Sequence, residues 1–111
     1  MPKRIRDYGI VIGELPAGEQ NAITDVPDVQ VGQVTLNDGA VKTGVTAILP
    51  HTGSLFREKL PCAVHVMNGF GKPIGAVQIE ELGTLETPIV LTNTLSVGTA
   101  ADALISHMLA R

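Results

Sequence analysis

The residues best suited to chemistry gather in one stretch of the chain, from Glu80 to Thr99. Its centre is an apolar run, Pro88 to Leu91, followed by the polar residues Thr92, Asn93 and Thr94. Side chains at the carboxyl end of a buried strand lie outside the packed core while the strand holds them rigidly, so they often form a pocket floor. The plainer interpretation is a buried strand whose polar end is only a turn and a helix cap, which is the commoner case.

Two adjacent carboxylates, Glu80 and Glu81, open this stretch. On a helix they would point roughly 100° apart, so at most one of them can face a given substrate. We therefore expect one of the two to enter a site and the other to be solvated.

Familiar catalytic and metal-binding patterns are missing. The fragment Gly69-Phe70-Gly71 lacks the third glycine of a dinucleotide fingerprint. Ser96 is outside a GxSxG elbow, which favours a helix cap. The three histidines have no metal-ligand spacing between them: His51, His65 and His107. The residues alone therefore predict no metal site and no nucleotide cofactor.

Length and composition suit one domain or part of one. Hydrophobic residues make up 44% of the 111 positions and charged ones 17%, so we expect an apolar face that belongs against another chain. The net charge of −3 and the scattered basic residues exclude a nucleic-acid footprint. Cys62 stands alone, so there is no internal disulfide. The sequence shows neither a signal peptide nor a run near the ~20 apolar residues of a membrane helix, and we expect a cytoplasmic protein without membrane contact.

The first third of the chain predicts short strands. Tyr8 to Ile12 is apolar enough for one of them. Two more are expected around the turn at residues 25–28, because Pro27 lies where the period-two spacing slips. Gly32, inside the second of these, predicts a bulge or a close backbone approach.

The middle of the chain predicts a hairpin and a further strand. Asn37-Asp38-Gly39 is a strong turn signal, and residues 41–49 form the β unit that follows it. Residues 51–59 read as a polar loop. Ala63 to Met67 is apolar except for His65 and is expected to be a strand.

The last third predicts two helices around a strand. Apolar residues between Pro73 and Leu82 have nearly helical spacing, and Gly83 stands where a C-cap glycine would. Residues 89–92 form the strand, and residues 97–111 the clearest helix, with Ser96 or Thr94 as its cap. The pattern indicates an α/β or α+β fold with mixed sheet. The final helix has no glycine stop, so we expect the chain to continue beyond Arg111.

Four segments carry a resemblance to a known family: RDYGI, NAITDVPDVQVGQVTL, KTGVTAILPH and VMNGFGKPIGAVQIEELGTLETPIVLTNTLSVGT. In this order they resemble the N-terminal part of the DmpA-type aminopeptidases, also called L-aminopeptidase/D-esterases or peptidase family S58. The resemblance covers about nine tenths of the chain.

This resemblance implies a DmpA-like αββα four-layer sandwich with mixed sheets, of which residues 1–111 would be the N-terminal segment of a single hydrolytic domain. Members of the family cleave themselves before a Ser or Thr, which becomes the nucleophile at the start of a smaller β subunit. They release N-terminal residues from peptides, amides or esters, need no metal or organic cofactor, and assemble as oligomers of αβ units.

For this chain, the resemblance implies no catalytic residue, because the family's nucleophile lies beyond the matched part. The chain would supply the pocket wall, and its partners would be the remainder of the α subunit and the β subunit. An amide could bind a substrate carbonyl or carboxylate, and Glu81 a substrate ammonium; each can equally serve a turn or a buried hydrogen bond. The candidate wall residues are Asn68, Gly69, Phe70, Glu81, Asn93 and Thr94.

Two alternatives stay open. One is an acyl transferase of the ornithine acetyltransferase type, which shares the Ser or Thr nucleophile and differs in using an amino acceptor instead of water. The other is a non-catalytic binding or assembly module. The sequence of residues 83–94, GTLETPIVLTNT, favours the peptidase.

Overall fold

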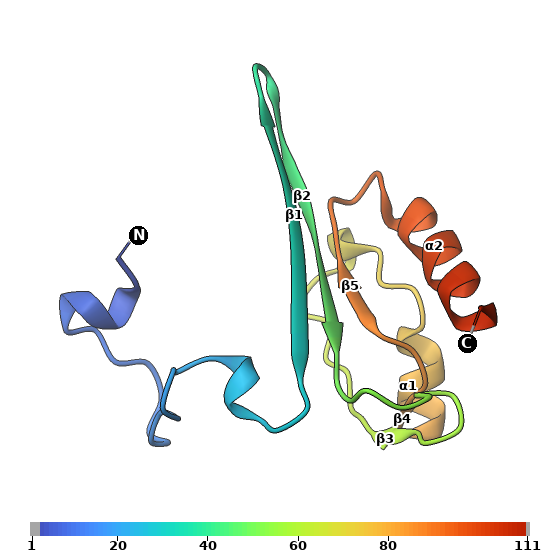
Figure 1. Cartoon of the computed structure of the whole chain (residues 1–111), viewed down its shortest axis with the longest axis horizontal. Coiled ribbons are helices and arrows are strands. Elements are labelled where there is room, and N and C mark those ends of the chain that lie inside the picture. The colour runs from blue at the N-terminus through green and yellow to red at the C-terminus, as the bar shows by residue number, and fades with distance from the viewer. Residues whose placement is uncertain (1–2, 111) are drawn as a thin grey trace.

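A long antiparallel hairpin forms the centre of the computed structural model, which describes residues 3–110 (Figure 1). Strands β1 (Gln30–Asp38) and β2 (Val41–Leu49) pair along their whole lengths, from Gln30 opposite Leu49 to Asp38 opposite Val41. Strand β5 (Ile89–Leu91) pairs antiparallel with β2, which gives the order β1-β2-β5. A second, two-stranded sheet joins β3 (Leu60–Pro61) and β4 (Thr84–Leu85).

Two α-helices accompany these sheets. Helix α1 (Ala76–Leu82) ends at Gly83, whose φ is +65° and whose N–H donates to the Ile79 carbonyl, as predicted for a C-cap glycine. Helix α2 (Val97–Leu109) confirms the helix predicted from its apolar spacing. Three short 3₁₀ helices complete the elements: η1 (Ile5–Tyr8), η2 (Ile23–Asp25) and η3 (Gly69–Gly71).

The α+β arrangement is as predicted, and every strand pair between residues 3 and 110 is antiparallel. Several predicted strands are wrong. Residues 8–12 and 63–67 contain no strand, and the first of the two strands expected around Pro27 is replaced by η2. An apolar segment becomes a strand only when its backbone finds a partner to bond, and the described part of the chain offers these segments none.

The predicted close backbone approach occurs at Gly44 instead of Gly32. Gly32 faces Ala47 in an unbroken register without a bulge, and a Cβ there would meet nothing within 4 Å. A Cβ at Gly44 would lie 2.6 Å from the Val34 carbonyl oxygen. Gly39 fills the other special position, the first residue of the hairpin turn, with a φ of +50°.

Gly44→Ala is expected to lower the free energy of unfolding of the protein by about 1–3 kcal/mol, because the backbone of β1 must move to admit the methyl group. Gly32→Ala is the matched control in the same hairpin, and we expect it to change stability by no more than about 0.5 kcal/mol. Urea denaturation of both variants measures the difference. Equal effects at the two positions would show that the strands do not approach as described.

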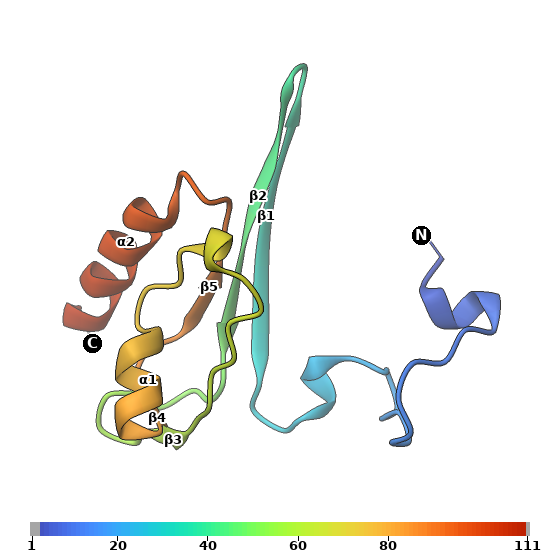
Figure 2. The same ribbon diagram turned by 180° about the vertical axis from the view of Figure 1, so that it is seen from behind.

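The N-terminal arm, residues 3–29, leaves the sheet and runs away from it (Figures 1 and 2). Its own hydrogen bonds fold it back: the Arg4 guanidinium donates to the carbonyls of Gln20, at 2.6 Å, and of Asn21. The Asp25 carboxylate accepts the N–H groups of Gln20 at 3.0 Å and Ala22 at 3.1 Å. Side chains of opposite charge therefore close the arm into a local loop.

We expect this local loop of the arm to open in acid. The backbone N–H of Ala22, and then that of Gln20, hold the pKa of the Asp25 carboxyl below its ordinary value. A carboxylate with a lowered pKa stabilises the fold above its unfolded pKa, and that contribution is lost as the pH falls through the folded value. The amide resonances of Gln20 and Ala22 should therefore stay constant near neutrality and shift together below about pH 4. Asp25→Asn should remove this acid transition, and its persistence in the variant would contradict the assignment.

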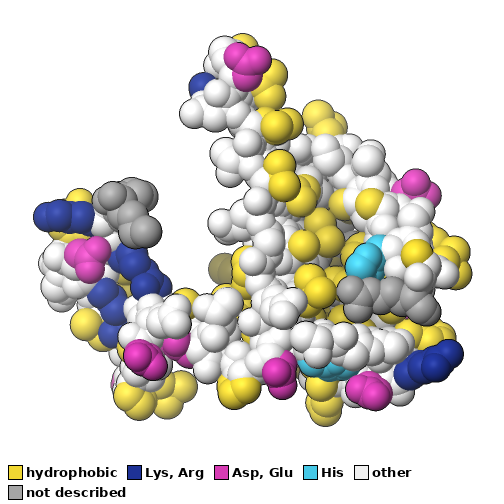
Figure 3. Space-filling view, viewed as in Figure 1, with side chains coloured by type: hydrophobic (Ala, Val, Ile, Leu, Met, Phe, Trp, Pro, Cys, Tyr) yellow, Lys and Arg dark blue, Asp and Glu magenta, His cyan; other side chains and the backbone are white. Residues whose placement is uncertain are grey.

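Little of the apolar surface is covered within residues 3–110. Leu55, 4% exposed, and Leu85, 8% exposed, are the buried hydrophobic side chains of this part. The accessible surface is 8922 Å², against about 5,800 Å² for a compact monomer of this mass. The radius of gyration is 16.0 Å, against about 13 Å for a compact domain of this length. Figure 3 shows exposed apolar side chains along the hairpin and in the hollow beside α2. No described helix has the length and apolarity to cross a membrane.

Candidate functional site

The side chain of Asn93 joins three elements at the end of β5. Its Nδ2 donates to Thr43 Oγ1 on β2 at 3.1 Å. Its Oδ1 accepts the N–H groups of Leu95 and Ser96, both at 3.1 Å, just before α2 begins. Ser96 occupies the predicted N-cap position, but its own side chain makes no capping bond, and the two bonds to Asn93 order the turn that leads into the helix. The amide oxygen is thus fully used, and one N–H of Nδ2 has no partner among the described residues.

Asn68 makes fewer bonds at η3. Its Oδ1 accepts only the N–H of Phe70 at 3.1 Å, and no described residue accepts from its Nδ2. Asn93 therefore offers a ligand only an N–H group, whereas Asn68 offers N–H groups and one unused acceptor position on its oxygen. Both amides can donate to a carbonyl oxygen or a carboxylate.

The remaining candidates around η3 and β5 are open to solvent. Phe70 is 81% exposed, with Lys72 Nζ 5.2 Å from its ring centroid. A Cβ at Gly69 would meet nothing within 4 Å. Thr94 is exposed. These residues therefore lie on the accessible surface of the described part of the chain.

Glu81 lies apart from the two amides. It stands exposed in the last turn of α1, which leads through Gly83 into β4. In Figures 1 and 2, α1 and β4 occupy the end of the molecule where β5 begins, whereas η3 lies toward the end where β5 finishes. The role of Glu81 as an ammonium partner stays a prediction.

An apolar groove lies beside Asn93, between α2 and the sheet. Its volume is about 350 Å³, and its mainly aliphatic lining includes three residues with a hydroxyl group, Thr92, Ser96 and Thr99. Such a lining accepts an aliphatic group with a polar end. The groove is lined by Val45, Val90, Thr92, Ser96, Thr99, Ala100, Ala103 and Leu104.

Sequence reasoning missed Thr43, which holds the Asn93 amide from 50 positions away. Thr43 lies in the period-two pattern of a strand like any other threonine. Only the antiparallel register, with Thr46 opposite Leu91, brings it near the end of β5, so no local signal could have found it. Between residues 3 and 110, no three His, Cys, Asp or Glu side chains gather into a possible metal site.

The sequence model of peptidase family S58 matches residues 21–111 of this chain. The chain belongs to peptidase family S58. The resemblance noted from the sequence is thereby confirmed, and the α+β class of this S58 segment agrees with the solved structures it matches.

Among curated relatives, the S58 segment is 40% identical over 114 residues to the β-peptidyl aminopeptidase BapA of Sphingosinicella microcystinivorans, covering 95% of this chain and 28% of that protein. It is 38% identical to BapA of Sphingosinicella xenopeptidilytica, covering 86% and 25%. The sequence thus spans little more than a quarter of these relatives.

Among solved structures, the segment matches the PH0078 protein of Pyrococcus horikoshii OT3 with a TM-score of 0.89 and 49% identity, covering 97% of this chain and 33% of that one. It matches a β-aminopeptidase of Burkholderia sp. with a TM-score of 0.82 and 48% identity, covering 95% and 31%.

Proposed function

We propose that residues 1–111 form part of the substrate-binding wall of an S58 aminopeptidase that releases the N-terminal residue from peptides, amides or esters. The observation that carries this proposal is the 40% identity to a β-peptidyl aminopeptidase over 95% of the chain. The side-chain N–H groups of Asn68 and Asn93 that have no partner among the described residues support it, because hydrolysis of an acyl group places negative charge on the carbonyl oxygen.

In this proposal the attacking hydroxyl comes from a Ser or Thr outside residues 1–111, freed as an N-terminus when the precursor cleaves itself. The free N–H of Asn93 donates to the acyl oxygen or to the substrate backbone, and Asn68 contacts the substrate from η3. Phe70, Gly69 and Thr94 line the wall. Glu81 takes the substrate ammonium once the rest of the protein has completed the pocket, and several αβ units assemble into a homo-oligomer.

The test is an assay of the complete protein on p-nitroanilides of α- and β-amino acids, with a denaturing gel of the same sample. We expect release of p-nitroaniline and two polypeptides on the gel. An intact single polypeptide without hydrolysis would count against the proposal. Transfer of the acyl group to an added amino acceptor, in place of hydrolysis, would favour the acyl transferase.

A further inference from the structure

The ring of His51 bridges two points of the loop that joins β2 to β3. Its Nε2 lies 2.9 Å from the backbone oxygen of Glu58, and its Nδ1 accepts the N–H of Gly53 at 3.0 Å. A carbonyl oxygen only accepts, so Nε2 must carry a proton; an amide N–H only donates, so Nδ1 must be bare. The two contacts together require one state of the ring, the neutral imidazole with its proton on Nε2.

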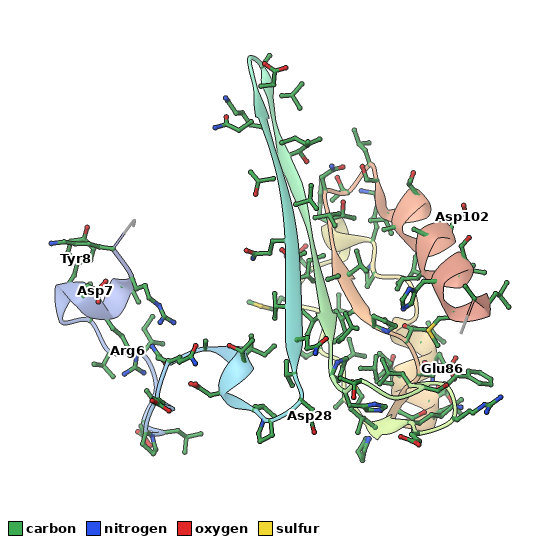
Figure 4. All side chains as sticks on the ribbon, viewed as in Figure 1. Arg6, Asp7, Tyr8, Asp28, Glu86 and Asp102 are labelled. Atoms are coloured by element: carbon green, nitrogen blue, oxygen red, sulfur yellow. The ribbon has the colours of Figure 1, made fainter. Side chains whose placement is uncertain are left out.

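The two bonds of the His51 ring close the loop of residues 51–59, and this loop contributes to the small hydrophobic core of the described residues. It carries Leu55, whose side chain is only 4% exposed. Its end carries Lys59, whose Nζ lies 3.8 Å from a carboxylate oxygen of Glu86. Glu86, labelled in Figure 4, belongs to the segment between β4 and β5. The loop therefore links the end of β2 to the segment between β4 and β5.

We propose that His51 is a proton-sensitive clasp on the 51–59 loop. The clasp closes when the imidazole is neutral. A second proton, which must go to Nδ1, removes the acceptor for Gly53 N–H and opens one side of the clasp, while the bond to Glu58 remains. Histidine is the side-chain type that ordinarily changes its charge between pH 5 and pH 8, which makes this the range to examine.

The charged groups of this loop and of the segment facing it determine which group can bind the protonated Nδ1. Arg57, Glu58 and Lys59 come from the loop itself, and Glu86 comes from the facing segment. The Glu58 carboxylate oxygen and His51 Nδ1 lie 2.9 Å and 3.2 Å from the point where a Cβ at Gly53 would stand. The carboxylate oxygen therefore lies within about 6 Å of Nδ1, near enough to become the partner of the added proton once Gly53 has moved away.

The test uses the complete protein with its glycines and histidines labelled with ¹⁵N, and follows the Gly53 amide and both His51 ring nitrogens between pH 8 and pH 5. We expect the proton on Nε2 at pH 8 and a Gly53 amide shift that follows the protonation of Nδ1. A proton on Nδ1 at pH 8, or a Gly53 amide that stays constant while the ring titrates, would overturn the proposal.

Two variants identify the group that titrates. In His51→Asn the side-chain oxygen can still accept the Gly53 N–H but cannot titrate in this range, so the Gly53 shift should disappear. In Glu58→Gln the backbone oxygen and the ring are both kept, so the shift should persist. A shift that survives in the first variant or vanishes in the second would assign the response to another group and reject the clasp.

Discussion

Asn93→Ala is expected, under the proposed function, to lower kcat of the complete protein by roughly 10²-fold or more, the usual loss when one donor to a developing oxyanion is removed. The same change removes the acceptor of the Leu95 and Ser96 N–H groups and the bond to Thr43. We therefore also expect the free energy of unfolding to fall by about 1–2 kcal/mol. Steady-state rates per folded molecule and urea denaturation measure the two effects separately.

Asn93→Asp is the matched control, because a carboxylate keeps the two accepting bonds of the turn before α2 and loses both N–H groups. It should reproduce the loss of kcat with most of this turn retained. Thr43→Val removes only the partner that orients the amide, and its effect on kcat should be smaller than that of either change at Asn93. If Asn93→Asp turns over at the normal rate while Asn93→Ala is merely less stable, the residue shapes the turn before α2 and does not contact the substrate.

The parts of the fold that could be predicted are those fixed by neighbours in sequence. Helix α2 followed from apolar spacing, the end of α1 from Gly83, and the hairpin from its turn residues, because each depends on contacts within a few residues. Residues 63–67 have the same apolar character as β2 but no partner strand in this part of the chain. The pattern indicates that a segment can form a strand, and only a second segment decides whether it does.

The candidate site divides in the same way. Asn93 could be chosen from sequence because an amide at the end of an apolar strand is a local signal. Its orientation could not, since it depends on Thr43 across the sheet. Nor could the clasp at His51, because the bond to Gly53 follows from the shape of a loop that has no repeated sequence pattern.

Residues 1–111 expressed alone are expected to show no cooperative thermal unfolding. Ordering the backbone costs about 1–2 kcal/mol for each residue, and the apolar side chains buried within the described part of the chain are only those of Leu55, Leu85 and Pro88. Its surface exceeds that of a compact monomer by roughly 3,000 Å², the scale of an obligate interface. Far-UV circular dichroism on heating should give a gradual change for the segment and a sharp transition for the complete protein.

A single substitution on the apolar face of the hairpin tests whether the rest of the protein covers this surface. Val34 is 63% exposed in this segment. It lies directly opposite Val45, so both side chains are on the same face of the sheet, and Val45 also lines the groove beside α2. If the rest of the protein covers this face, Val34→Asp in the complete chain buries an unpaired charge and should cost about 3 kcal/mol or more. Asn37→Asp adds the same charge beside Lys42 near the hairpin turn, where we expect a change within about 0.5 kcal/mol. A cooperative melt for the segment alone, or a harmless Val34→Asp, would mean that this apolar face needs no cover.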